Sequence, residues 1–313
     1  MKHQNLVCAL LYLAVLLSFP PVPGCAESPQ TVTVSMRPYK DARSVVAVKV
    51  NGAGPYDFLV DTGATISVLD TALFNQLGLR AEGAFRVVSS AGATAQIRSV
   101  VEEITLDRLS VRNITVVSLK SPMPGADYRA VRGILGENFL RHFDILIDNQ
   151  HRTMTLDADD GLADSLAGER LPVIFPPLSQ GDDNRYQPTI SAKFQAYGPA
   201  RLLLDSGATT LVLLQWGMQR NGWGEDATLR TVNGSLPCAS TVDKLHLGRG
   251  TVGDFVIMRC QTATLKEPDR EGVLPTAIFK QVFISHAGSS AIVNPTPRRD
   301  LALEMAAVTS WLQ

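Results

Sequence analysis

The sequence predicts an all-β protein made of two similar lobes, and three features of the chain point to this class. Its 313 residues are enough for two domains of ordinary size. The 24 glycines and 18 prolines, with few long helix-forming runs, favour many short strands joined by turns. The strongest feature is an internal repeat, in which residues 46–70 return as residues 190–214. Because repeated sequence indicates repeated structure, we expect two similar β lobes related by a pseudo-two-fold axis, with short helices.

Composition narrows the class of function. Lys and Arg total 29 and Asp and Glu total 30, so the net charge of −1 gives no electrostatic reason to expect nucleic acid as a partner. With 45% apolar and 19% charged residues, a packed core is expected rather than disorder. The five histidines are scattered, and neither a CxxC nor an HExxH pattern occurs. We therefore predict no bound metal and no cofactor.

The N-terminus has the pattern of a signal peptide. Lys2 precedes an apolar run at residues 6–19, which is short for a membrane span, and a proline-rich segment with small residues follows. Cleavage after Ala26 would release the chain, whereas cleavage before Cys25, in a segment similar to a bacterial lipobox, would leave a lipid anchor there. An uncut membrane anchor is a third interpretation. We expect an exported protein, either periplasmic, secreted or attached to the outer membrane as a lipoprotein.

Each copy of the repeat predicts a strand, a Gly-Pro turn, a second apolar strand and an Asp-(Thr/Ser)-Gly-Ala-Thr segment. Further along, both copies continue with a two-stranded hairpin and then a short apolar segment that begins with glycine. The matching segments are 104–106 and 114–117 with 245–247 and 255–258, and Gly133-Ile134-Leu135-Gly136 with Gly272-Val273-Leu274-Pro275. The predicted units are a signal peptide at 1–26, an N-terminal lobe at 31–157, a linker at 158–170, a C-terminal lobe at 171–298 and a C-terminal helix at 299–313.

Two cysteines of the second copy are predicted to pair. The hairpin of this copy turns at Gly248-Arg249-Gly250. A turn centred on Arg249 places Cys238 and Cys260, which are equally far from it, opposite each other on adjacent strands. Because an exported chain meets an oxidising environment, we predict a disulfide between them. Two buried free thiols are the alternative.

Asp61 and Asp205 carry the chemistry that the repeat suggests. Each ends an apolar strand and is followed by a hydroxyl residue and a glycine, which alone would be typical of an ordinary turn. Two copies related by a two-fold axis, however, would bring both carboxylates together at that axis. Such a pair shares one proton, so it offers a base for a bound water and an acid for a carbonyl oxygen. It could therefore hydrolyse an amide without a metal ion.

With these paired motifs the chain resembles the pepsin-like and retropepsin-like aspartyl proteases, in a two-lobed, bacterial, exported form. The resemblance implies that both lobes are retropepsin-like barrels and that Asp61 and Asp205 form a catalytic dyad. It also implies aspartic endopeptidase activity on a peptide or protein substrate, bound extended in the cleft between the lobes by a monomer. The supporting residues it implies are Thr62 and Ser206 for hydrogen bonds between the two loops, Gly63 and Gly207 for close approach of backbone amides, and Thr65 and Thr209 for further support.

In this family a flap between the catalytic strand and the next hairpin closes over the substrate. Residues 88–94 and 231–235 occupy this position in the two copies, and both are rich in small residues. Ordinary surface turns are the alternative interpretation. Neither tip carries an aromatic residue, so the resemblance is closer to the retroviral type than to pepsin. The flap candidates are Ser90 and Gly92 in the first copy and Asn233 and Gly234 in the second.

One position departs from the family pattern. Pro275 stands where the first copy has Gly136, and proline removes a backbone donor where close approach is expected. A degraded second lobe would favour a non-catalytic envelope protein that binds peptides or a partner on the same scaffold. A hydrolase of small molecules that uses the same two carboxylates is a further alternative. In every case we expect membrane contact only through a lipid anchor at Cys25.

Overall fold

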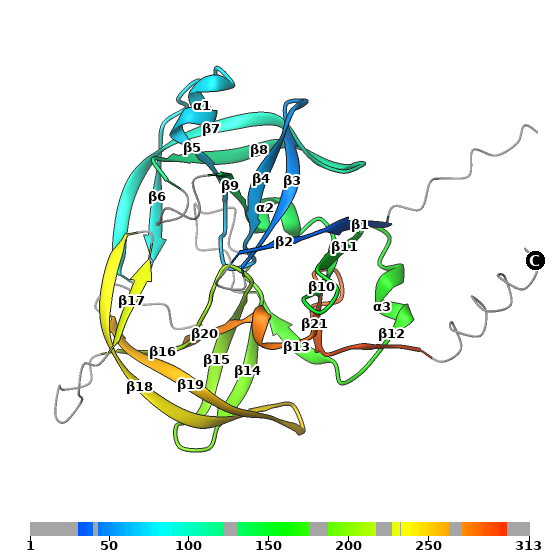
Figure 1. Ribbon diagram of the computed structural model, residues 1–313, viewed down its shortest axis with the longest axis vertical. Coiled ribbons are helices and arrows are strands. Elements are labelled where there is room, and N and C mark those ends of the chain that lie inside the picture. The colour runs from blue at the N-terminus through cyan, green and yellow to red at the C-terminus, as the bar shows by residue number, and fades with distance from the viewer. Residues whose placement is uncertain are drawn as a thin grey trace, which may run out of the picture.

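The computed structural model describes residues 31–39, 43–89, 91–121, 130–175, 187–216, 227–231, 233–262 and 271–298. In these residues nearly all regular structure is β-strand, and the α-helices have at most six residues (Figure 1). The predicted all-β class is therefore confirmed. Within the described residues no helix is both long enough and apolar enough to cross a lipid bilayer. The predicted signal peptide and the predicted helix at 299–313 lie outside them.

The first lobe is built on an eight-stranded sheet with the strand order β2-β3-β4-β9-β5-β8-β7-β6. An extra pairing of β3 with β7 curls this sheet toward a barrel. Its elements are β2 (Arg37–Pro38), β3 (Ser44–Val50), β4 (Ala53–Val60), β5 (Ser67–Asp70), α1 (Thr71–Gln76), β6 (Ala84–Ser89), β7 (Gly92–Leu106), β8 (Leu109–Leu119), β9 (Val131–Leu135) and α2 (Glu137–Leu140).

The second lobe repeats this arrangement strand for strand. Its order β14-β15-β20-β16-β19-β18-β17 matches β3-β4-β9-β5-β8-β7-β6, and the extra pairing β14–β18 matches β3–β7. The internal sequence repeat is therefore a repeat of topology. Its elements are β14 (Thr189–Phe194), β15 (Gly198–Asp205), β16 (Leu211–Trp216), β17 (Ala227–Thr231), β18 (Gly234–Leu247), β19 (Gly250–Thr262), β20 (Gly272–Pro275) and the short 3₁₀ helix η2 (Thr276–Ile278).

A third unit, not predicted from the sequence, joins the lobes. It has six strands in the order β1-β11-β10-β21-β22-β13, and β13 also pairs with β14 of the second lobe. At its centre β10 and β21 run antiparallel, with Leu146 opposite Phe283. Because these strands hold equivalent places in the two halves, the pseudo-two-fold axis passes between them. The strands are β1 (Thr31–Ser35), β10 (Asp144–Asp148), β11 (Thr153–Asp157), β13 (Leu171–Ile174), β21 (Gln281–Ser285) and β22 (Ser290–Val293).

The segment predicted as a linker also has regular structure. It contains the short helix α3 (Gly161–Ser165) and β12 (Leu166–Ala167), and β12 pairs with β23 (Thr296–Pro297) near the end of the described chain. The domain boundaries themselves remain a prediction.

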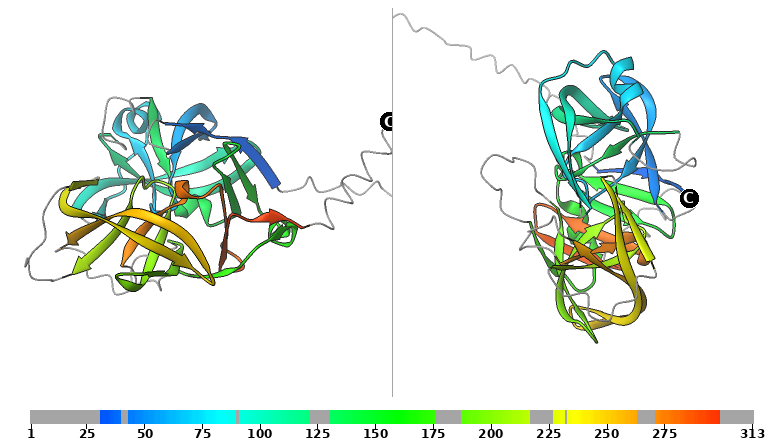
Figure 2. Two further views of the ribbon diagram at one scale, coloured as in Figure 1. Left: turned by 60° about the horizontal axis from the view of Figure 1, so that its bottom comes forward. Right: turned by 90° about the vertical axis from the view of Figure 1, so that its left-hand side faces the viewer.

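Each lobe buries its own apolar cluster. The cluster of the first lobe includes the fully buried Phe58 and Phe139, and that of the second includes Phe194 and Leu204. The lobes lie beside each other in all views, and the hairpins β6–β7 and β17–β18 meet on one side of the molecule (Figures 1 and 2). The two barrels therefore support the loops between them from opposite sides.

The predicted disulfide is present. Cys238 and Cys260 face each other on β18 and β19, with a Cα–Cα distance of 4.2 Å and a closed S–S bond. The predicted register holds along the hairpin as far as Leu245, after which a bulge shifts the pairing near the turn. Both half-cystines are buried, so the bond is part of the packed interior of the second lobe.

Candidate active site

The two aspartates lie at equivalent strand ends. Asp61 directly follows β4, and Asp205 is the last residue of β15. Behind each strand runs a parallel partner, β9 behind β4 and β20 behind β15. The Asp61 amide donates a hydrogen bond to Leu135 O at 3.1 Å, which fixes the start of the first loop to β9. The loops are thus positioned by contacts within their own lobes as well as by contacts between the lobes.

The structure brings the two aspartates together. Their carboxyl groups share a hydrogen bond across the lobe boundary. On its own side, each carboxylate accepts a backbone hydrogen bond from the glycine two residues later: Gly63 N to Asp61 Oδ1 at 2.9 Å and Gly207 N to Asp205 Oδ1 at 2.7 Å. A second amide, Ala208 N, donates to Asp205 Oδ1 at 3.0 Å. These bonds fix the position of each carboxyl group within its own loop.

The environment of Asp61 favours its protonated form. Burial raises the pKa of the Asp61 carboxyl well above its usual range, and repulsion by the Asp205 charge raises it further. The hydrogen bonds from Gly63 and Ala64 stabilise the charged form and oppose this shift. The Asp61 side chain nevertheless keeps a partly exposed surface. The pair therefore keeps a proton to higher pH than an isolated aspartate would, and Asp61 is still partly exposed.

A reciprocal set of hydrogen bonds ties the two loops to each other. Thr62 Oγ1 donates to Leu204 O at 2.8 Å and accepts from Ser206 N at 3.0 Å. In the opposite direction, Ser206 Oγ donates to Val60 O at 2.8 Å and accepts from Thr62 N at 3.1 Å. Because each hydroxyl is both donor and acceptor in the opposite lobe, the set is symmetric about the axis. It produces the locking contact that the resemblance implied for Thr62 and Ser206.

The two glycines of the loops are required by space. A Cβ atom on Gly63 would lie 2.4 Å from Cγ of Asp205, and one on Gly207 would lie 2.5 Å from Cγ of Asp61. Each glycine thus packs against the carboxyl group of the opposite lobe. Thr65 is half-buried and Thr209 is exposed, and among the described residues neither hydroxyl has a hydrogen-bond partner. Their supporting role stays a prediction.

The loop of the first lobe rests on a buried polar network. Ser67 Oγ accepts a hydrogen bond from Gly136 N at 3.1 Å, and both Ser67 N and Ser67 Oγ donate to Asn138 Oδ1 at 2.8 Å. Asn138 Nδ2 in turn donates to Thr115 O at 2.7 Å. A Cβ on Gly136 would lie 2.8 Å from the carbonyl of Ile66, so β9 and the loop are in direct backbone contact.

The second lobe replaces this network by apolar packing. The repeat aligns Ser67 with Leu211, and the strands β9 and β20 align Gly136 with Pro275 and Asn138 with Ala277. Pro275 lacks the amide proton that Gly136 donates, but Leu211 also lacks the hydroxyl that would accept it. The side-chain members of the polar set are therefore absent together, so the proline leaves no serine hydroxyl without its donor. The doubt that Pro275 raised about this loop has a structural answer.

Both predicted flaps are hairpin tips, and they touch. The β6–β7 hairpin turns between Ser89 and Gly92, and the β17–β18 hairpin turns between Thr231 and Gly234. Ser89 Oγ lies 3.0 Å from Thr231 Oγ1. Asn233 Nδ2 donates to Val87 O at 3.1 Å and to Gly92 O at 2.9 Å. The flap candidate Ser90 lies outside the described residues.

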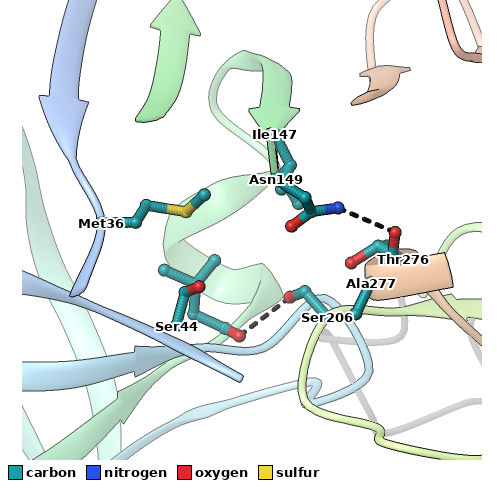
Figure 3. Close-up of a pocket in the computed structure, with 8 residues that line it drawn as sticks. Met36, Ser44, Ile147, Asn149, Ser206, Thr276 and Ala277 are labelled. Carbon is teal, nitrogen blue, oxygen red and sulfur yellow. Dashed lines mark hydrogen bonds between the residues drawn. The ribbon is translucent and has the colours of Figure 1, made fainter. Parts of the chain in front are cut away.

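Two contacts near the loops had no signal in the sequence. Gln187 Nε2, from the second lobe, donates to Gly63 O beside the dyad. On the other side of the loops, a small cavity of about 10 Å³ lies under Ser206, between the loops and the joining sheet (Figure 3). Its polar lining includes Asn149, which is hydrogen-bonded to Thr276 O at 2.9 Å. The hydrogen bonds of Gln187 and Asn149 both join parts of the chain that are far apart in sequence, so local patterns could not reveal them.

Comparisons with known proteins found two similarities. Residues 46–139 match the family model described as aspartyl protease. This match lies within the predicted N-terminal lobe and supports the resemblance there. A solved structure, a retropepsin-like aspartic protease from Rickettsia conorii, is similar at 18% identity over 42% of this chain and 93% of that chain, with a TM-score of 0.31. No curated protein sequence matches.

Proposed function

We propose that the protein is an aspartic endopeptidase whose dyad is Asp61 and Asp205. The observation that carries the proposal is the hydrogen-bonded carboxyl pair, held between the lobes by reciprocal bonds of Thr62 and Ser206. One carboxylate is ionised and removes a proton from a bound water, while its protonated partner donates to the carbonyl oxygen of the scissile amide. Collapse of the resulting tetrahedral intermediate then transfers a proton to the leaving amine.

The proposed substrate is an extended peptide. Such a peptide would lie over the carboxyl pair and under the flap tips, with its backbone hydrogen-bonded as an added strand. The contact between Asn233 and the first flap supports this arrangement, because it joins the flap tips of the two lobes to each other. The flaps must separate for a peptide to enter.

The test compares matched Asp to Asn substitutions. Asp61→Asn and Asp205→Asn remove one carboxylate each at nearly constant volume, so we expect cleavage of a fluorogenic peptide library to fall at least a thousandfold in both. Asp107→Asn is the control, because Asp107 is exposed in the β7–β8 turn away from the loops. Inhibition by a pepstatin-type compound should accompany the wild-type activity. Cleavage by either dyad variant at the wild-type rate would rule out the mechanism.

The alternative, a non-catalytic binding protein, predicts a different result. The folded wild-type chain would then cleave no peptide between about pH 3 and pH 8 but would still bind peptides. The intact first loop and the compensated Pro275 argue for activity in both lobes rather than for a degraded second half.

We further propose that the chain is exported. The closed disulfide supports this, because such bonds form and persist in oxidising compartments. Mass spectrometry of the mature protein from its host tests the proposal. A chain that begins at residue 27 indicates an ordinary signal peptide, a lipid-modified Cys25 indicates a lipoprotein, and a mature protein that still contains residues 1–26 contradicts both.

A further inference from the structure

The two lobes are joined at a second pair of contacts, below the carboxyl loops. Asn149 and His286 are the first residues after the central strands β10 and β21 of the joining sheet, so they hold equivalent places in the two halves. Each side chain crosses the axis to the first residue of the short helix that follows the strand behind the opposite catalytic loop. Asn149 reaches Thr276 after β20, and His286 reaches Glu137 after β9.

The two contacts differ in chemistry. Asn149 Nδ2 donates to the carbonyls of Thr276 and Phe279, both at 2.9 Å, and none of these three groups is ionisable. The neighbouring Asp148 accepts from Gln281 and pairs with the exposed His151. On the other side, His286 Nε2 lies 2.8 Å from Glu137 Oε2, and His286 Nδ1 donates to Phe143 O at 2.8 Å. Phe175 stacks on the imidazole at a centroid distance of 5.5 Å. The Asn149 contact is therefore neutral, whereas the His286 contact is made by two ionisable groups.

The ionisable contact is buried. The Glu137 side chain is 0% exposed and the His286 side chain 6% exposed. Among the described polar atoms, Glu137 Oε1 is buried without a hydrogen-bond partner. With Nδ1 committed as a donor to Phe143 O, one proton lies between Nε2 and Oε2 and keeps the pair neutral overall. A second proton, or none, would leave a net charge in the interior, which is costly.

The pair is connected to the carboxyl loop of the first lobe by one residue. Glu137 N donates to Ala64 O at 2.8 Å, and Ala64 N donates to Asp61 O at 3.2 Å. A shift of Glu137 would thus be passed directly to the loop that holds Asp61. On the lobe-two side, His286 N donates to Asp144 Oδ1 at 2.9 Å, which fixes the histidine backbone to β10.

We propose that Glu137 and His286 are positioning residues, which keep the Asp61 loop in register with the second lobe only while the pair holds its single shared proton. This inference rests on the proposed function for its effect on catalysis, whereas the joint itself can be tested without it. The contact weakens when the pair loses its proton at higher pH, whereas the Asn149 contact shares no such proton.

Other charged groups near the pair set the pH range. Burial alone would lower the pKa of His286, but attraction and a hydrogen bond from Glu137, together with Phe143 O and Asp144, raise it above the ordinary value. Burial raises the pKa of Glu137, and His286 and Arg141 oppose this. His142 also faces the pair, and Asp160 acts on Asp144. Because the raised His286 pKa favours the folded state below the ordinary pH range of histidine, this stabilisation is lost as pH rises through the raised pKa.

The test uses the full chain and three variants. His286→Ala removes the contact, and Glu137→Gln keeps its shape, since the amide can donate to a neutral imidazole, but removes the shared proton. His151→Gln is the matched control, because His151 forms a similar 2.7 Å pair with Asp148 while 65% exposed. We expect His286→Ala to lower kcat at least tenfold with KM within about twofold. Glu137→Gln should lower kcat less than His286→Ala does, and His151→Gln should match wild type.

The second readout does not need catalysis. In an Asp61→Asn background, which removes the dyad's titration, the thermal unfolding midpoint of the chain should fall between about pH 6 and pH 9. Adding Glu137→Gln should remove most of that fall, and adding His151→Gln should not. If the midpoint has the same pH dependence with and without Glu137→Gln, the shared proton is refuted. A folded His286→Ala protein with wild-type kcat refutes the positioning role. Wild-type inactivity with the expected unfolding profile refutes only the proposed function.

Discussion

Gly63 of the first lobe lies against the carboxyl group of Asp205 in the second, so closely that a Cβ atom would be 2.4 Å from Cγ. The reverse contact, between Gly207 and Asp61, has the same geometry. The carboxyl group of each lobe therefore limits the size of the residue that the opposite lobe can carry two positions after its aspartate. The two loops are packed as one unit, and their tolerance to substitution should reflect this.

A single methyl group at Gly63 should abolish activity. Gly63→Ala places its Cβ inside the Asp205 carboxyl, so the loops must move apart, and the cost of such overpacking is about 1–3 kcal/mol in unfolding free energy. We expect kcat to fall at least a hundredfold. Gly250→Ala is the control, because its Cβ would meet Leu247 O at an ordinary 3.6 Å. Peptide cleavage and thermal unfolding measure both effects, and a fully active Gly63→Ala protein would contradict the packing argument.

Proline should be tolerated behind one loop and not behind the other. Gly136→Pro removes the donor to Ser67 Oγ and adds atoms where the Ile66 carbonyl already lies within 2.8 Å of a Cβ position. We expect it to lower the unfolding free energy by about 3 kcal/mol or more. The reverse change, Pro275→Gly, meets no waiting acceptor, because Leu211 replaces the serine, and should cost about 1 kcal/mol or less. Urea unfolding of both variants distinguishes them, and equal losses would refute the compensation.

The disulfide should stabilise the second lobe. It closes a loop of 22 residues, for which the chain-entropy model gives about 3 kcal/mol. We expect the double variant Cys238→Ala/Cys260→Ala to unfold several degrees below wild type. A reducing agent should lower the midpoint of the wild-type protein and leave that of the double variant unchanged. The idea fails if reduction has no effect on wild type.

The stability of the protein should be greatest at mildly acidic pH. The pKa of Asp61 is raised by burial and by Asp205, and that of Asp144 is raised by burial. The folded chain therefore binds more protons than the unfolded chain above the ordinary aspartate range, so the free energy of unfolding falls as pH rises from about 4 toward neutrality. Asp61→Asn should flatten this dependence in thermal unfolding measured over the same range. An equally steep profile in the variant would show that the dyad does not titrate in this way.

Much of the candidate site follows from the duplication. One Asp-Thr-Gly segment is ambiguous, but two copies at equal spacing predict a meeting of carboxylates, and the structure places Asp61 and Asp205 in contact. The pairing of Cys238 with Cys260 was predicted because hairpin register follows from a local turn. These are features for which neighbouring residues, or an exact repeat, carry the information.

Other features depend on contacts that no local pattern encodes. The pairing of β10 with β21 joins strands from opposite halves, and both strands look like ordinary parts of their own lobe in sequence. Glu137 and His286 are 149 residues apart in the sequence, and only the folded chain reveals them as neighbours. The predicted support from Thr65 and Thr209 came from position in the motif alone, and no hydrogen bond within the described residues accompanies it.

The strands β10 and β21, which pair across the axis, belong to one covalent chain, and this has a consequence for how the two halves can change during evolution. In a symmetric pair of separate subunits, any substitution would appear on both sides of the seam at once. Here one covalent chain carries two independent copies, so one side can keep serine, glycine and asparagine while the other adopts leucine, proline and alanine. The fused chain therefore allows the supports behind the two aspartate loops to differ, so that the two halves of one site need not stay identical.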